Sequence, residues 1–205
     1  LSEVRCPDSG ATRAMKREID KAIENRDSLG GTFRVVVKGL VPGLGGYATG
    51  RDRLTSQLGA AVLSIPAIKG IEFGLGFDAA RLPGSKVHDE IVLDPQTGFT
   101  RAGNNAGGLE GGMTTGLPLI ITAAMKPIAT LMQPLRTVDL DTLEPAEASK
   151  ERSDVCAVPA AAVIAEAEVA FVLADAYLRK FGCDNMTDIK AAVKSYRQRL
   201  RTLSR

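Results

Sequence analysis

The sequence predicts a single α+β domain with mainly antiparallel strands. A helix–strand–helix–strand order in the first third, short strand candidates in the middle and two helices at the end predict this class. The chain has 205 residues, 44% of them hydrophobic, which is enough for one sizeable core. No change in composition along the chain marks a second domain.

The first third is expected to hold two helices and two strands. Residues 11–28 predict a helix because apolar side chains recur at spacings of three and four, and residues 32–38 predict a strand centred on three valines. A glycine-rich connection leads to a second helix that ends near Pro66, and residues 71–77 follow as a strand. The two apolar helix stripes are Ala11, Met15, Ile19, Ala22 and Ile23, and Leu54, Leu58, Ala61, Val62 and Ile65.

Short strands are expected in the middle of the chain. Residues 91–101 resemble a hairpin that turns at Pro95–Gly98. The apolar run at 117–124 predicts a strand, and residues 137–140 predict a shorter one.

The last third predicts two helices. Pro159 suits the first turn of a helix over 159–181, and Gly182 suits the position just after it. A final helix is expected over 188–203. The packed face of the first of these helices is expected to consist of Val163, Ala167, Ala170, Ala174 and Leu178.

Composition excludes some classes of site. No apolar run is long enough to span a bilayer and no signal peptide is visible, so we expect a cytoplasmic protein with no membrane partner. The three cysteines are far apart and predict free thiols and no metal site, and His88 is the only histidine. The net charge of +2 argues neither for nor against a polyanionic partner. Because the chain opens on Leu1, we expect a fragment or a processed product.

The segment 101–130 is the strongest chemical signal. Six glycines crowd into residues 103–116, and an apolar run then leads to Lys126 and Thr130. Exposed backbone N–H groups, an ammonium and a hydroxyl suit a phosphate or another anion, although the segment lacks the ending of a P-loop. A flexible linker and a solvated lysine at a strand end are the alternatives.

Three other clusters are candidates. In Arg152-Ser153-Asp154, the arginine suits a carboxylate or phosphate and the aspartate could move a proton; an ordinary surface pair beside a helix is the alternative. The His88-Asp89-Glu90 run could hold an acid/base imidazole or a structural one. The basic C-terminal helix could bind RNA, although its charge spacing is more typical of a solvated face.

Five blocks of this sequence resemble the C-terminal half of the chorismate synthase family. They are NNAGGLEGGMTTG at 104–116, AMKPIAT at 124–130, RSDVCAVPAAAVIAEAEV at 152–169, DSLGGTFRVVVKGLVPGLG at 27–45 and SIPAIKGIEFGLGF at 64–77. The resemblance covers residues 1–205 in one order, with the family's N-terminal half absent. It implies a βαβ sandwich, with helices packed between mainly antiparallel sheets, assembled as a homotetramer.

The resemblance also implies a reaction and its residues. Family members convert 5-enolpyruvylshikimate 3-phosphate to chorismate and phosphate by 1,4-elimination, and they require reduced FMN, which is thought to lend an electron transiently. Asp154 and Arg152 match catalytic positions, and no nucleic acid is expected. Because the absent half carries the family's histidines and several arginines, the fragment alone is expected to be inactive. The implied FMN contacts are Pro66, Ala67, Gly111, Lys126, Pro127, Ile128, Ala129, Thr130 and Arg152.

A non-enzymatic scaffold is the second hypothesis, and an RNA-binding module is the third. The scaffold hypothesis predicts that Lys126→Ala and Arg152→Ala leave the activity of a restored enzyme intact.

Overall fold

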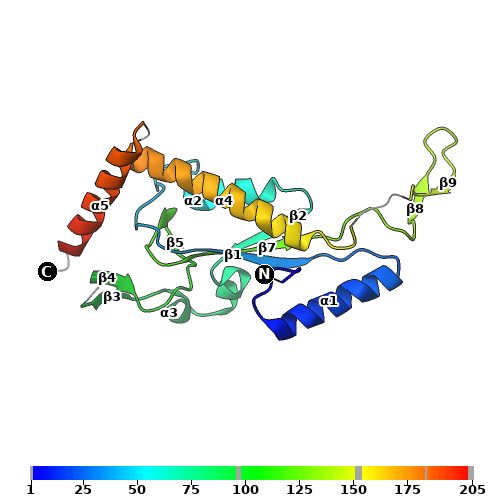
Figure 1. The fold of residues 1–205 in the computed structure, drawn as a ribbon, viewed down its shortest axis with the longest axis horizontal. Helices are drawn as coiled ribbons and strands as arrows, with labels where there is room; N and C mark the ends of the chain where they lie inside the picture. The colour runs from blue at the N-terminus through cyan, green and yellow to red at the C-terminus, as the bar shows by residue number, and fades with distance from the viewer. Residues whose placement is uncertain (1, 96–97, 151–153, 183, 203–205) are drawn as a thin grey trace.

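The computed structural model describes residues 2–95, 98–150, 154–182 and 184–202 of the chain (Figure 1). Helices and strands alternate at first, small hairpins follow, and two long helices end the chain. The elements in order are α1 Ser9–Glu24, β1 Gly31–Val37, α2 Leu54–Leu63, β2 Ile68–Phe73, a 3₁₀ helix Gly76–Arg81, α3 Gly84–Val87, β3 Ile91–Asp94, β4 Gly98–Arg101, β5 Leu109–Glu110, β6 Met113–Thr114, β7 Leu119–Met125, β8 Arg136–Val138, β9 Pro145–Glu147, α4 Val158–Phe181 and α5 Met186–Thr202.

A three-stranded sheet forms the centre, in the order β1-β7-β2. Strand β7 is antiparallel to both neighbours, and its pairing with β1 runs without a break from Gly31 opposite Met125 to Val37 opposite Leu119. The predicted β1–α2–β2 unit is therefore present, but β7, from later in the chain, lies between its two strands. The expected α+β class with antiparallel pairing is confirmed.

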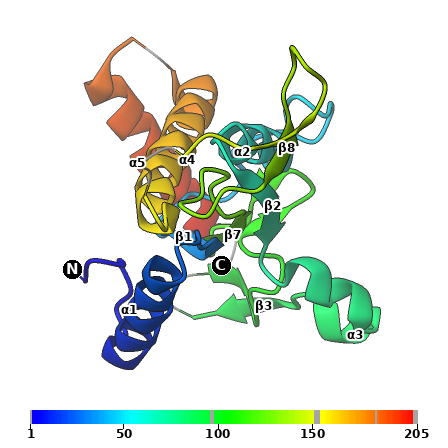
Figure 2. The ribbon, with the colours of Figure 1, turned by 90° about the vertical axis from the view of Figure 1, so that its right-hand side faces the viewer.

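Helices α2 and α4 cover one face of this sheet (Figure 2). The pattern along β7 alternates, because Leu119, Ile121 and Ala123 are buried while Ile120 and Thr122 are only half-buried. The three buried side chains belong to the same apolar cluster as the inner faces of α2 and α4. Helix α1 lies on the opposite side of the sheet from α4 (Figures 1 and 2).

The packed face of α4 differs from the prediction. All five residues expected to pack are exposed. The helix is rich in small apolar residues on nearly every side, so periodicity alone does not select one face. Alanines at the actual contact let α4 approach β1 and α2 closely. The buried residues are Ala161, Ala165, Val169, Leu173 and Ala176.

The other elements follow the sequence pattern closely. Of the predicted α2 stripe, Leu54, Leu58, Val62 and Ile65 are buried as expected and Ala61 is half-buried. In α1 only Ala22 is buried, and Met15 and Ile23 are exposed. Strands β3 and β4 pair antiparallel with Asp94 opposite Gly98, as the predicted hairpin requires. Strand β2 ends at Phe73, earlier than predicted, because a 3₁₀ helix follows. The predicted short strand near 137–140 is β8, and its partner β9 was not predicted.

The β8–β9 hairpin extends away from the sheet as a separate arm (Figure 1). Its tip is organised by Asp139. The N–H groups of Asp141 and Thr142 both donate to Oδ1 of Asp139 at 2.9 Å. The backbone of Asp139 closes the turn by donating to the carbonyl of Glu144 and accepting from the N–H of Leu143, each at 2.9 Å.

Acid is expected to loosen this tip. The N–H groups of Thr142 and Asp141 hold the pKa of Asp139 below its ordinary value of 3.8. Because the folded pKa is the lower one, the stabilisation is complete above the ordinary value and is lost as the pH falls through the folded pKa. Amide NMR shifts of Asp141 and Thr142, followed from about pH 7 to about pH 2, measure this. A midpoint above 3.8 would contradict it, and Asp139→Asn removes the titration as a control.

Candidate functional site

Four separate segments meet at the end of β7 that carries Met125. The N–H of Lys126 donates to the carbonyl of Ala67 at 2.9 Å. The hydroxyl of Ser28 donates to the carbonyl of Ile128 at 2.5 Å. The N–H of Leu29 donates to the carbonyl of Val155 at 2.7 Å. Together, these three hydrogen bonds join the loops after α1 and β7 to the segments before β2 and α4. We call this the β7-end cluster: Ser28, Leu29, Ala67, 126–130 and Val155.

Pro66 and Ala67 occupy the centre of a tight turn between α2 and β2. The N–H of Ile68 donates to the carbonyl of Ile65 at 3.2 Å, and Ala67 has a φ of +67°. Proline at the second position and a positive φ at the third are typical of a type II turn, which usually has glycine at that third position. Alanine is therefore held in a costly conformation beside the candidate site.

Replacing Ala67 by glycine is expected to raise the free energy of unfolding by about 0.5–1 kcal/mol, because it relieves the positive φ. Urea denaturation measures the change. Ala60→Gly, at an exposed position inside α2, is the matched control and is expected to lower stability by about 1 kcal/mol. Equal losses in the two variants would contradict the turn geometry.

The side chains of the cluster combine a cation with polar groups. The backbone of Lys126 is fixed by the bond from its N–H to the carbonyl of Ala67, while its side chain is exposed to solvent. Pro127 and Ala129 are exposed, and Ile128 and Thr130 are half-buried. An ammonium and a hydroxyl on one short segment suit an anionic group.

Asp154 lies at the edge of the same cluster. It is exposed and directly precedes Val155, whose carbonyl is bound by Leu29. Arg152, predicted beside it, lies outside the described residues. The structure thus brings Pro66, Ala67, the 126–130 segment and Asp154 to one end of the sheet.

Gly111 lies at the other end. With Gly112 it forms the two-residue turn of the β5–β6 hairpin, with φ values of +59° and +84°. The N–H of Leu54, the first residue of α2, donates to the carbonyl of Gly112, whereas Ala67 follows the last turn of α2. The seven residues of β7 separate the two ends by about 20 Å. A Cβ at Gly111 would meet no atom within 4 Å. The contact of Gly111 with FMN, which the resemblance implies, stays a prediction.

Most of the glycine-rich segment packs against the protein itself. The N–H groups of Asn105 and Ala106 donate to the two carboxylate oxygens of Asp89, each at 2.9 Å. A Cβ on Gly107 would lie 2.2 Å from the backbone nitrogen of Gly74. These N–H groups thus hold an anion, but it is the chain's own carboxylate. His88 beside it is exposed.

The role of Asp89 was missed from the sequence. A carboxylate near a segment rich in asparagine and glycine can accept hydrogen bonds from the N–H groups of that segment. This pattern could have predicted that Asp89 holds the loop, as an alternative to acid/base chemistry.

Other classes of site find little support. Within the described ranges, Cys6 and Cys156 are free thiols, as expected, and no group of three metal-ligating side chains forms; Cys183 lies outside them. No described helix has the length and apolar character needed to cross a membrane.

Comparison with known proteins supports one family. Residues 1–178 match the model of the chorismate synthase family. The chorismate synthase of Rubrobacter xylanophilus is 57% identical over 199 residues, which are 97% of this chain and 51% of that protein. That of Bacillus subtilis is 52% identical over 197 residues, which are 96% of this chain and 50% of that protein.

The structural comparison agrees. A crystal structure of chorismate synthase superposes with a TM-score of 0.83 at 40% identity, covering 98% of this chain and 52% of that one. The expected family fold is therefore confirmed, and the chain spans about half the length of the relatives it matches. The chain belongs to the chorismate synthase family.

Proposed function

We propose that this chain supplies one part of a site that converts 5-enolpyruvylshikimate 3-phosphate to chorismate and phosphate by 1,4-elimination, with reduced FMN bound. The observation that carries the proposal is 57% identity to a chorismate synthase along nearly the whole chain. The β7-end cluster supports it, since it gathers most of the residues that the resemblance assigns.

The cluster fits a phosphate-bearing group by its donor chemistry. Lys126 would attract the phosphate of FMN or of the substrate as a point charge, and Thr130 would bind a polar edge. Asp154, exposed beside them, would take up or orient the proton, and Arg152 would bind a carboxylate or phosphate. When bound, reduced FMN supplies electron density transiently as phosphate leaves.

These residues form only part of a catalytic site. Stabilising a departing phosphate needs several cations aimed at it, and the described part of the cluster contains one lysine. We therefore propose that the chain alone is inactive, and that the remaining cations come from the segment that makes up the other half of its relatives.

An exposed apolar face of α4 supports the proposal that a second segment completes the site. Phe171 is 75% exposed, Ile164 48% and Leu178 37%, all on the side turned away from the buried alanines. A continuous apolar stripe on a helix is typical of a surface that packs against further protein. We propose that the other half packs on this stripe, and that the complete protein is a cytoplasmic homotetramer.

Lysine substitution tests the proposed role of the cluster. The chain is combined with the complementary half of the Rubrobacter protein and titrated with FMN in the presence of substrate. Lys126→Ala is expected to weaken FMN or substrate binding about 10- to 100-fold, because one charge-assisted contact is lost.

Lys38→Ala is the matched control. Lys38 is also an exposed lysine, but it follows the opposite end of β1. If the two variants bind and turn over alike, Lys126 has no part in the site, and the non-enzymatic scaffold gains support.

A further inference from the structure

A single buried hydroxyl joins a hairpin to a loop at the end of the sheet opposite the β7-end cluster. The hydroxyl of Thr114, the last residue of β6, donates to the carbonyl of Val41 at 2.6 Å and accepts from the N–H of Leu44 at 2.9 Å. The backbone of Thr114 adds to this contact, because its carbonyl accepts from the N–H of Gly43 at 2.7 Å and its N–H donates to the carbonyl of Leu44 at 3.0 Å. Thr114 is only 4% exposed. All of these partners lie in the segment that follows β1, which we call the 39–46 loop.

This contact holds the hairpin that carries Gly111. Strand β6 begins directly after the turn at Gly111 and Gly112, and Thr114 ends that strand. The loop also touches the turn, since a Cβ on Gly45 would lie 2.6 Å from the carbonyl oxygen of Gly112. A Cβ at Gly111 would itself meet no atom within 4 Å, so the hairpin and the loop, and no packing of its own, fix where it lies.

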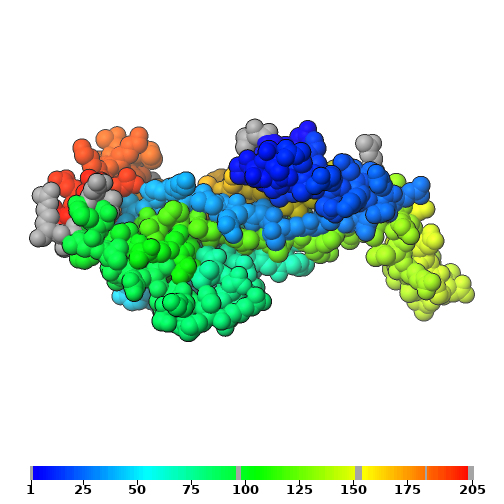
Figure 3. Space-filling model, turned by 90° about the horizontal axis from the view of Figure 1, so that it is seen from below, coloured from blue at the N-terminus to red at the C-terminus, as the bar shows by residue number. Residues whose placement is uncertain are grey.

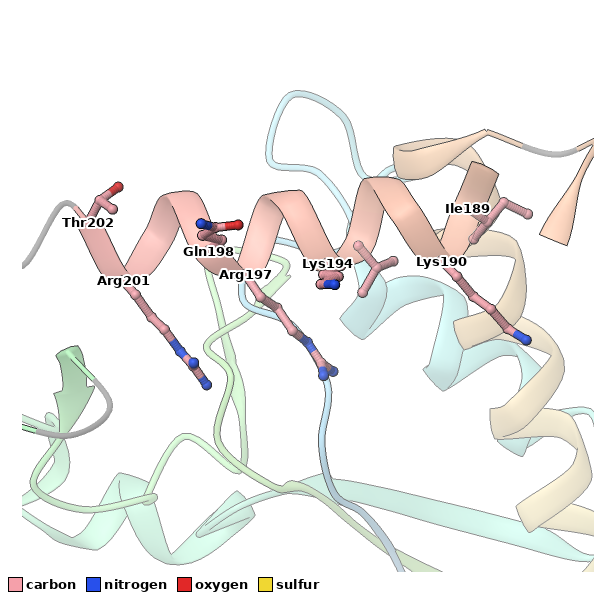
Figure 4. Close-up of a pocket in the computed structure, with 8 residues that line it drawn as sticks. Ile189, Lys190, Lys194, Arg197, Gln198, Arg201 and Thr202 are labelled. Carbon is pink, nitrogen blue, oxygen red and sulfur yellow. The ribbon is translucent and has the colours of Figure 1, made fainter. Parts of the chain in front are cut away.

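Helix α5 holds the 39–46 loop from outside. The hydroxyl of Tyr196 donates to the carbonyl of Pro42 at 3.0 Å. The guanidinium of Arg197 donates to the carbonyl of Gly39 at 2.9 Å, and Figure 4 shows this side chain pointing from α5 toward the loop. Helix α5 lies at the same end of the long axis as strand β5 of the hairpin (Figures 1 and 3). The match to the family model ends at residue 178, so both contacts come from beyond it.

Three aromatic rings join α5 to α4 beside the loop. The ring of Phe181 lies 5.9 Å from that of Tyr177 and 5.4 Å from that of Tyr196, measured between centroids. The hydroxyl of Tyr177 accepts from the N–H of Val41 at 3.2 Å, and the ammonium of Lys180 lies 4.7 Å from the centroid of the Tyr196 ring. The two tyrosine hydroxyls thus reach the loop from one packed aromatic cluster, which restricts their motion.

We propose that Thr114 is a positioning residue, because its bonds to the 39–46 loop set where the Gly111 backbone meets FMN. Tyr177 and Tyr196 hold the loop in turn. The inference rests on the proposed function, because the resemblance alone assigns Gly111 to FMN. Thr114 is buried and its hydroxyl is directed at the loop, so it acts through the hairpin and not on the flavin. A glycine offers only backbone to a ligand, so the strength of its contact depends on where the hairpin places that backbone.

Thr114→Val removes the hydroxyl and keeps nearly the same shape. The carbonyl of Val41 and the N–H of Leu44 then lose a buried partner, and the loop has to shift to pair them again. Amide hydrogen exchange in the chain alone measures this step. The N–H of Leu44 is expected to exchange at least about tenfold faster, whereas the N–H of Lys126, bonded to Ala67 at the other end of the sheet, is expected to keep its rate.

FMN binding measures the consequence for the site. The chain is combined with the complementary half of the Rubrobacter protein and titrated with FMN in the presence of substrate. Thr114→Val is expected to weaken FMN binding about tenfold, whereas Thr114→Ser, which keeps the hydroxyl, is expected to stay within about twofold of the wild type. Tyr196→Phe, which removes only the bond to Pro42, is expected to weaken FMN binding about threefold. At saturating FMN all three variants are expected to turn over at nearly the wild-type rate, since no group that touches the substrate has changed.

Val169→Ala is the matched control. Val169 is a buried core residue of α4 and belongs to neither the hairpin nor the loop. Its truncation lowers stability but is expected to leave FMN binding within about twofold of the wild type. Circular dichroism and urea denaturation establish that each variant is folded under the conditions of the titration.

The outcomes separate this role from the proposed function. If folded Thr114→Val binds FMN as tightly as the wild type, or if Val169→Ala weakens binding equally, Thr114 has no positioning role and the proposed function stands. An unchanged exchange rate at Leu44 excludes the hold on the loop in the same way. A wild-type mixture that binds no FMN overturns both. If Thr114→Val does not fold, Tyr196→Phe decides, and unaltered FMN binding in that folded variant overturns the role.

Discussion

Gly74→Ala is expected to abolish stable folding of this chain. A Cβ at this position would lie 2.0 Å from the carbonyl oxygen of Asn105 and 2.4 Å from the nitrogen of Gly107, and φ is already +59°. Both obstructing atoms belong to backbone. They cannot move away without breaking the hydrogen bond from the N–H of Leu75 to the carbonyl of Asn105, which is 2.8 Å long. We expect a loss of about 4 kcal/mol or more, measured by urea denaturation.

Gly59→Ala provides the matched control. Gly59 is a buried glycine inside α2, but a Cβ there would meet no atom within 4 Å. Alanine favours the helix, so this variant is expected to gain about 0.5–1 kcal/mol. If Gly74→Ala is as stable as the wild type, the close backbone contact between the glycine segment and the end of β2 is wrong.

Ala165→Glu is expected to be nearly as damaging. Ala165 is fully buried, and it belongs to the apolar cluster that α4 forms with α2 and the sheet. A carboxylate would have to be desolvated or protonated, which costs about 4 kcal/mol or more in a small domain. Thermal or urea unfolding followed by circular dichroism measures the loss.

Ala167→Glu separates the two faces of α4. Ala167 is exposed, so the same change there is expected to alter stability by no more than about 0.5 kcal/mol. Comparable losses in both variants would mean that the packed face is assigned wrongly. The exposed variant also bears on the proposed assembly, because a charge on the outer stripe is expected to weaken docking of the other half while the chain itself stays folded.

The local pattern of the sequence predicted most elements of this fold. Valine-rich β1, the α2 stripe and the β3–β4 hairpin are determined by short-range periodicity and turn chemistry. The packed face of α4 was not predictable in this way, since alanines and valines occur all round the helix. Strand β9 was missed because Pro145–Glu147 is short and polar, and its pairing depends on the Asp139 turn.

The candidate site, like the fold, could be predicted only in part. The resemblance pointed to the 126–130 segment and to Pro66-Ala67, and only the fold reveals that they touch through Lys126 and Ala67. No local pattern could reveal that Gly111 lies a full strand length away. Nor could it show that Asp89 occupies the N–H groups of Asn105 and Ala106, because that contact joins loops sixteen and seventeen residues apart.

Formation of chorismate by a two-part protein tests the central claim most directly. The chain is mixed with the complementary half of the Rubrobacter chorismate synthase, 5-enolpyruvylshikimate 3-phosphate and reduced FMN without oxygen, and chorismate and phosphate are measured together. We predict equal amounts of both products from the mixture, and none from either part alone or without reduced flavin. If the folded parts associate and bind FMN but form no chorismate, or if the mixture works without reduced flavin, the proposed function is contradicted.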